Sequence, residues 1–223
     1  MHDTISTGSG IAVRAARPSD APLLATFDIM ASSDPFGRPF WQDLLPSDTD
    51  PRAFAEALFS EDACGWGAVP EFIVIEVDGE PAAGCSVFAA KEPPADGPIR
   101  SDRLPSVGRR LGWDAGTIEA AVEAYETAWD QLPASYRLPQ ASAIVEAVAV
   151  LPGFRGRGLG HRLMETAKAH ARALGHDSLG ISVIHGNDRA ARLYEAHFEP
   201  YATFHPASFA GGFPGVTKYR ARL

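Results

Sequence analysis

The sequence has little cysteine and no long apolar run, and each shortage excludes a class of protein. The 223 residues include two cysteines. Cys64 and Cys85 are too few for a disulfide scaffold, and neither stands in a metal-ligand spacing, so we expect reduced thiols in a cytoplasmic protein without a metal. No apolar run approaches the length of a membrane span. The opening stretch MHDTISTGSG has neither a basic start nor an apolar run, so no secretory signal is expected.

Net positive charge is also lacking. The formal net charge is -8, so nonspecific binding to nucleic acid or to an anionic membrane is not expected. Hydrophobic residues make up 45% and charged residues 22%, which is typical of a soluble globular protein. The length suits one sizeable core. We therefore expect a single domain over residues 1–223.

The first ninety residues predict a strand, two helices and a hairpin. Ser19 is a plausible N-cap of the first helix. Asp50 suits the N-cap of the second, with Pro51 in its first position. Asp78-Gly79 is a tight-turn dipeptide between two apolar runs. The expected elements are a strand at 11–16, helices at 18–30 and 50–59, and strands at 72–77 and 82–88.

Residues 90–140 have a different composition and form an expected insertion. They are rich in Pro, Asp and Arg, and they predict one amphipathic helix, TIEAAVEAYETAWDQL. Its apolar residues recur at helical spacing: Ile118, Val122, Tyr125 and Trp129. Such a helix either covers a sheet or belongs to an insertion that covers a substrate, and the sequence leaves both open.

Strands and helices alternate in the second half, as an α/β or α+β fold requires. The tail predicts two last strands joined by a Gly-rich loop. The other expected elements are a strand at 143–150, a helix at 158–174 closed by Gly175, a strand at 179–184 and a helix at 187–196.

The strand AIVEAVAV has one charged residue in an apolar setting. Period-two alternation places Ile144, Glu146, Val148 and Val150 on one side. A carboxylate in a central strand is costly unless it is paired or lines a cavity. Glu146 is therefore either half of an ion pair with a neighbouring strand or a functional acid or base with a raised pKa.

The loop after that strand suits an anion. It is not a Walker loop, because no Gly-Lys-Ser/Thr follows, and the dinucleotide fingerprint lacks its third glycine. The spacing present is Arg155-x-x-Gly158-x-Gly160, with a helix beginning inside it. Backbone amides at a helix N-terminus, with Arg155 and Arg157 beside them, favour a pyrophosphate over an ordinary flexible connection.

Two ordered motifs then resemble one known family. VEAVAVLPGFRGRGLGHRLM resembles the acetyl-CoA-binding segment of the GNAT N-acetyltransferases, and ISVIHGNDRAARLYEAHFEPY resembles their next strand, asparagine and tyrosine helix. GIAVRAARPSDAPLL is similar to the family's opening strand and helix. The resemblance covers most of the chain except the insertion. It implies a mixed, mostly antiparallel central sheet flanked by helices and splayed at its two central strands.

The resemblance also implies roles for particular residues. The strand backbone would pair with the pantetheine arm of acetyl-CoA, the loop amides and arginines would hold the pyrophosphate, and the second motif would contact the arm from the other side. The implied cofactor-binding residues are Val148, Ala149, Val150, Arg155, Gly156, Arg157, Gly158, Leu159, Gly160, Asn187, Ala190 and Tyr194.

The implied reaction is direct transfer of the acetyl group to a primary amine in a ternary complex. Glu146, or a water that it holds, would accept the amine proton, and Tyr194 would protonate the departing thiolate. A backbone amide near Val150 would stabilise the oxyanion. The alternative is a non-catalytic acyl-CoA-binding or regulatory module of the same fold, and a homodimer stays open. No metal is implied.

One departure from the family and two minor assignments complete the predictions. The run Tyr194-Glu195-Ala196-His197-Phe198 is one residue shorter than the family pattern and lacks its glycine, which leaves the helix end in doubt. Asp188 is expected to cap the last helix. His185 and His197 are expected to be structural or at the surface, although His161 could touch the cofactor.

The acceptor amine cannot be read from the sequence. Net negative charge favours a cationic amine only weakly. Aromatic residues could line its site or belong to the core, and the candidates are Phe36, Phe40, Trp41, Trp113, Tyr125, Trp129, Phe209 and Phe213.

Overall fold

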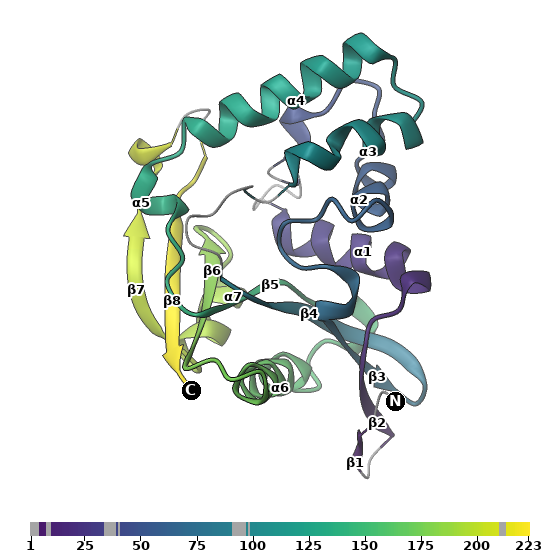
Figure 1. The fold of residues 1–223 in the computed structure, drawn as a ribbon. Helices are drawn as coiled ribbons and strands as arrows, with labels where there is room; N and C mark the ends of the chain where they lie inside the picture. The colour runs from purple at the N-terminus through teal and green to yellow at the C-terminus, as the bar shows by residue number, and fades with distance from the viewer. Residues whose placement is uncertain are drawn as a thin grey trace.

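The computed structural model describes residues 5–7, 10–33, 39, 41–90, 97, 99–209 and 213–223. Its centre is an eight-stranded sheet in the order β1-β2-β3-β4-β5-β6-β8-β7 (Figure 1). Strands β5 and β6 are parallel and the other neighbours are antiparallel, which confirms the predicted mixed α/β fold. The strands are β1 Ile5–Thr7, β2 Ile11–Ala15, β3 Phe72–Val77, β4 Glu80–Ala89, β5 Ala143–Val150, β6 Ser178–Ile184, β7 Glu199–Phe204 and β8 Val216–Arg222.

Helices cover both faces of this sheet. Helices α1 and α2 lie on one face and α6 lies on the other (Figure 1). The core accordingly divides into two buried clusters, one around α1 and α2 and one around α6. The helices are α1 Ala21–Ser32, α2 Pro51–Ser60, α3 Leu104–Arg110, α4 Ala115–Asp130, α5 Ala134–Arg137, α6 Leu159–Ala173 and α7 Asp188–Glu195.

Local sequence signals explain most element ends. The Asp50 side chain accepts a hydrogen bond from the Arg52 amide, so Asp50 caps α2 as predicted. Asp78 and Gly79 both adopt positive φ, 53° and 85°, which joins β3 and β4 by a two-residue turn. The predicted Ser19 cap is wrong, because Ser19 lies inside a 3-10 turn that precedes α1.

In the part of the insertion that the structure describes, residues 90, 97 and 99–140, there are three helices where the sequence predicts one. The predicted helix is α4, which runs across the top of the molecule from α3 to α5 (Figure 1). Its inner face is as expected: Tyr125 is buried, and its hydroxyl accepts a hydrogen bond from the Ile99 amide at 2.7 Å. Gly108 of α3 allows the close approach, because a Cβ there would lie 2.6 Å from Cγ1 of Ile118.

Strands β5 and β6 separate soon after they meet. They pair only at Ala143 with Leu179 and at Ile144 with Gly180, which confirms the predicted splay. Beyond that point the Gln140 side chain donates to the Ile181 carbonyl at 3.2 Å. The last residues of β5 thus have a strand neighbour only in β4.

A β-bulge interrupts β5 where β4 and β5 pair. Glu146 lies opposite Ser86 and Ala149 lies opposite Gly84, so two residues of β5 face one of β4. Ala147 in the bulge has φ 53°. The side chains change faces there, because Val148 and Val150 pack with the α6 cluster while Ala147 and Ala149 join the α1 cluster. The prediction that Glu146, Val148 and Val150 share one side is therefore wrong.

Within the described residues, no helix has the length and apolar content needed to cross a membrane.

Candidate active site

The loop between β5 and α6 forms an open, amide-rich turn. Gly156 and Gly158 have φ values of 77° and 74°, which favour glycine. A Cβ on either would have no neighbour within 4 Å, so the space in front of both is open. Gly158 is the N-cap of α6, and no side chain of the described residues caps this helix. Its first amides therefore lack acceptors and face the open side, a suitable place for an anion.

The rest of the loop is fixed from both sides. The Arg155 Nε donates to the Val150 carbonyl at 3.2 Å, which ties the loop to the end of β5. The Arg157 guanidinium lies 5.3 Å above the Phe154 ring. Leu159 is buried in the α6 cluster. Gly160 faces α7, because a Cβ there would lie 3.1 Å from a methyl group of Leu193.

Asn187 caps α7. Its Oδ1 accepts a hydrogen bond from the Ala190 amide at 3.1 Å. The prediction that Asp188 caps this helix is wrong, because Asp188 occupies the first helical position. The structure thus joins Asn187 and Ala190, the two residues predicted to contact the cofactor arm, by one hydrogen bond.

Tyr194 lies on the inner face of α7 with 6% of its surface exposed. Its ring packs against Phe198 and Tyr219, with centroids 6.5 and 6.3 Å away. Burial raises the pKa of the hydroxyl, and the nearby charges of Glu146 and Cys85 raise it further. The hydroxyl therefore carries its proton at neutral pH, as a proton donor must.

The shortened end of α7 does not need the missing glycine. The amides of His197 and Phe198 both donate to the Tyr194 carbonyl, at 2.9 and 2.7 Å. None of residues 196–198 has a positive φ. The helix ends at Glu195 and β7 begins at Glu199, so the departure leaves the tyrosine in place.

Glu146 projects from the α1 side of the sheet between β4 and the splay. The Ser86 hydroxyl fixes this part of the strand pair, donating to the carbonyls of Trp66 at 2.5 Å and of Glu146 at 3.3 Å. Burial raises the pKa of the Glu146 carboxyl to about 7, while the Lys218 ammonium acts in the opposite direction. A carboxyl that is half ionised near neutral pH suits a general base.

Two further buried ionisable groups interact with Glu146, and the sequence analysis missed both. Asp28 of α1 is 3% exposed, and burial raises its pKa to about 8. That value includes a lowering effect of the Trp41 indole and a raising effect of the Glu146 charge. Asp28 Oδ2 and Trp41 Nε1 are both buried without a hydrogen bond to a described residue. Lys218 of β8 is 7% exposed, and burial lowers its pKa to about 8.

A sequence signal existed for one of the two missed residues. Asp28 lies four residues after Leu24 and directly follows Phe27, so helical periodicity places a charge on the apolar face of the predicted first helix. Lys218 alternates with buried Tyr219, which places it on the opposite face of its strand, so its burial carries no such signal.

Several aromatic candidates for the acceptor site belong to the core. Trp41 is 1% exposed, and its ring centroid lies 5.3 Å from that of Phe54. Tyr125 is buried in the same cluster. Trp113 and Trp129 are half-buried, while Phe209 and Phe213 pair at 4.8 Å in the loop before β8. Phe36 and Phe40 lie outside the described residues.

The histidines are held by polar partners. His185 Nε2 lies 3.0 Å from the Thr217 hydroxyl. His161 Nδ1 lies 2.9 Å from His197 Nε2, and His197 Nδ1 lies 2.9 Å from Glu165. His161 thus belongs to a chain of side chains that joins α6 to the end of α7.

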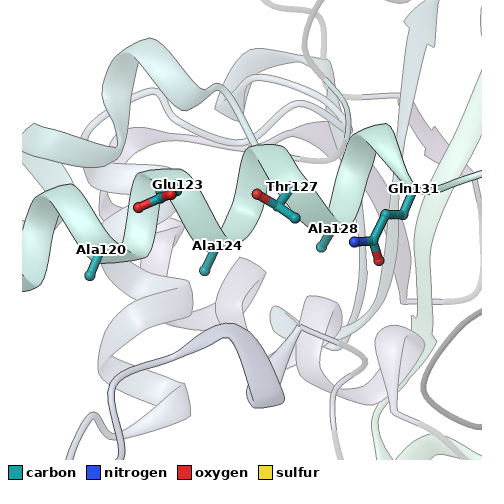
Figure 2. Close-up of a pocket in the computed structure, with 6 residues that line it drawn as sticks. All are labelled: Ala120, Glu123, Ala124, Thr127, Ala128 and Gln131. Atoms are coloured by element: carbon teal, nitrogen blue, oxygen red, sulfur yellow. The ribbon is translucent and has the colours of Figure 1, made fainter.

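A surface pocket lies elsewhere. It runs along one side of α4 and is lined by five residues of this helix and by Gln131, which directly follows it (Figure 2). None of the ionisable groups around Glu146 lines it. Its lining residues are Ala120, Glu123, Ala124, Thr127, Ala128 and Gln131.

Comparisons with known proteins agree with this geometry. The family model described as Acetyltransferase (GNAT) family matches residues 38–198. No curated protein matches the chain. Solved structures do match. An agmatine N-acetyltransferase is 20% identical with a TM-score of 0.56, and the match covers 96% of this chain and 100% of that one. A Drosophila melanogaster polyamine N-acetyltransferase is 16% identical with a TM-score of 0.54, and the match covers 96% of this chain and 100% of that one. An acetyltransferase of Salmonella typhimurium, solved with acetyl-CoA, matches at 16% identity and TM-score 0.52, with coverage of 96% and 94%. At these identities the structures support the fold alone.

Proposed function

The chain belongs to the GNAT acetyltransferase family, and from this premise we propose that it transfers an acetyl group from acetyl-CoA to a primary amine. The amine attacks the thioester directly while both substrates are bound. The acceptor's identity lies beyond this proposal. A cytoplasmic location stays a prediction.

One observation carries the proposal. Glu146 lies on β5 beside the splay, with its pKa raised to about 7 by burial, and the buried Tyr194 lies on α7, with its pKa raised by burial and by the Glu146 charge. Acetyl transfer to an amine needs a group that takes a proton and a group that gives one, both working near neutral pH. A module that only binds acyl-CoA needs neither.

The residues present fit the donor substrate. The open, uncapped start of α6 offers amides and partial positive charge to the pyrophosphate, with Arg155 and Arg157 beside it. The backbone of β5 from Val148 to Val150 has no neighbouring strand on the β6 side and can pair with the amide-containing arm. Asn187 and Ala190 stand at the start of α7. These residues would hold acetyl-CoA.

The chemistry is a balanced group transfer. The nitrogen of the amine forms a bond to the thioester carbonyl carbon, and the bond from that carbon to sulfur breaks. Glu146, directly or through a water, accepts the proton that nitrogen loses. Tyr194 supplies the proton that sulfur gains. An amide near Val150 stabilises the oxyanion that forms between the two steps.

The test is thiol release from acetyl-CoA with a broad panel of amines. We expect turnover by the wild type and a loss of about 10²- to 10⁴-fold in kcat/KM for Glu146→Gln, with unchanged CoA affinity. The matched control is Glu119→Gln, the same change at an exposed position on α4, which leaves both unchanged.

The non-catalytic alternative makes the opposite prediction. If CoA binds tightly and no amine of the panel releases thiol, the chain is an acyl-CoA-binding module. If turnover occurs and Glu146→Gln retains it, the chain is an acetyltransferase whose base is another group.

A further inference from the structure

Lys218 is a buried cation with fixed protein partners. Its ammonium donates to the carbonyl oxygens of Tyr136 at 2.6 Å and Leu138 at 2.8 Å. It also lies 5.0 Å above the Tyr136 ring and 5.9 Å above the Phe204 ring. Carbonyl dipoles and ring faces both stabilise a positive charge that has lost its water. A lysine held in this way is built to stay charged inside the protein.

The strand register places Lys218 on the same face of the sheet as Glu146. Lys218 lies opposite Ser182 of β6, and the flanking Ile181 and Tyr219 both face the α6 cluster. Lys218 therefore points to the other face. Val145 of β5 also faces α6, so Glu146 shares the face of Lys218.

This face has a covered margin on each side of Glu146. On one side Phe27 of α1 packs on β4, because a Cβ at Gly84 would lie 2.3 Å from its ring. On the other side Gln140, which follows α5, lies over Gly180 of β6. Glu146, itself half-buried, thus lies between α1 and the end of the insertion, where water screens its charge less than at an open surface.

Four ionisable groups from four elements interact with the Glu146 carboxyl. They are Asp28 of α1, Tyr136 of α5, Tyr194 of α7 and Lys218 of β8. Asp28 and both tyrosines are neutral or negative, so Lys218 is the cation of this set. The ionised form of Glu146 depends on it, since burial favours the neutral form.

We propose that Lys218 is a positioning residue for Glu146: its anchored, buried ammonium favours the ionised carboxylate and so raises the fraction of Glu146 that is ionised at neutral pH. The proposal rests on the proposed function of Glu146 as base. It also gives the insertion a role, because the carbonyls that anchor Lys218 belong to the segment at the insertion's end. Docking of residues 134–138 then sets the protonation of a group on β5.

The experiment measures the titration of Glu146 directly and through kinetics. Protein labelled with 13C at the glutamate carboxyls is titrated by NMR, and Glu146→Gln identifies the resonance. The variants are Lys218→Met and Lys218→Gln, both neutral, and Lys218→Arg, which keeps the charge. Gln retains a donor for the anchoring carbonyls, so one neutral variant folds even where Met does not. Lys168→Met is the control. Lys168 belongs to α6 and its ammonium also lies over an aromatic ring, 5.3 Å above Phe198 in the α6 cluster, which is on the other face of the sheet from Glu146.

We expect the neutral variants to raise the pKa of Glu146 by about one pH unit, and Arg and the control to leave it in place. The acidic limb of kcat/KM moves by the same amount, which lowers activity at pH 7 about fivefold and leaves the alkaline plateau unchanged. An unchanged Glu146 titration in a folded neutral variant overturns the proposal, as does a uniform loss of activity at every pH. If the Glu146 titration shifts while the acidic limb of kcat/KM does not, the electrostatic coupling to Lys218 is supported, and Glu146 is excluded as the base.

Discussion

The two faces of β5 differ in how they are assembled. On the α6 face, the groups that suit acetyl-CoA come from one continuous stretch, residues 148 to 194, in which the end of β5, a loop, α6, β6 and α7 follow one another. On the α1 face, the groups around Glu146 come from residues 28, 86, 136 and 218, which are remote in sequence. The first face is a local motif and the second exists only after folding.

This difference has a chemical parallel. The α6 face offers backbone amides and open space, so few side-chain identities matter there. The α1 face has the buried Asp28, the half-buried Glu146 and the buried Lys218, whose charges depend on burial and on one another. Substitutions on the first face should change binding, and those on the second should change pH dependence.

The largest expected effect breaks the anion site on the α6 face. Gly158→Asp places a carboxylate at the start of α6, where the amides and the helix dipole would hold a pyrophosphate. We expect CoA affinity to fall at least 100-fold, measured by calorimetry. The fold survives, because aspartate tolerates the left-handed region at a cost of about 1–2 kcal/mol.

The matched control is Gly175→Asp at the other end of the same helix. Gly175 also has positive φ, 87°, and open space around a Cβ. Gly175→Asp adds the same charge in the same left-handed backbone region, but at the C-terminal end of α6, away from the proposed anion site, so it leaves CoA affinity unchanged. Equal affinities for both variants would remove the pyrophosphate assignment.

A smaller effect tests Tyr194, which packs in the α6 cluster and interacts electrostatically with Glu146 on the α1 face. Tyr194→Phe removes the hydroxyl and keeps the packing against Phe198 and Tyr219. Because a thiolate is a fair leaving group, we expect kcat to fall only about 10- to 100-fold, at the lower end of general-acid effects. CoA affinity stays nearly the same. Equal turnover in a steady-state assay would exclude Tyr194 as the acid.

The smallest effect concerns stability and needs no substrate. The folded pKa of Glu146, about 7, lies above its ordinary value of 4.5. Its protonated form therefore contributes stability that is present below about pH 4.5 and is lost as the pH rises through 7. Glu146→Gln lacks this loss, so its Tm relative to wild type should rise by a few degrees between pH 5 and pH 8.

Thermal unfolding across this pH range measures the effect. Glu119→Gln, exposed on α4, should show a flat difference from wild type. A flat difference for Glu146→Gln as well would mean that its carboxyl is solvated, and the contrast between the two faces would then lose its chemical basis.

The sequence predicts the fold and the α6 face well for a physical reason. Hydrophobic periodicity and turn dipeptides such as Asp78-Gly79 act over short distances, and they locate strands, helices and the hairpin. The glycine loop and the asparagine-to-tyrosine spacing are local patterns too. Their assignment to acetyl-CoA stays a prediction, while the family itself is confirmed.

The α1 face could not be predicted in the same way. The electrostatic interaction of Glu146 with Lys218 depends on which strands neighbour β6, and strand order is not a local property. The prediction of a single helix for the insertion misses α3, because α3 is short and contains Pro105 and Gly108, which weaken a helical pattern. The bulge at Ala147 carries no local signal, since an alanine at positive φ is set by its surroundings.

The bulge at Ala147 reverses the alternation of side chains along β5. Before Ala147, even-numbered residues point to the α1 face, and after it they point to the α6 face. A substitution that alters the α1 face can therefore be sought at position 144, while 148 and 150 are left alone because they pack toward the α6 side. One extra residue in a strand thus lets the two faces be altered independently.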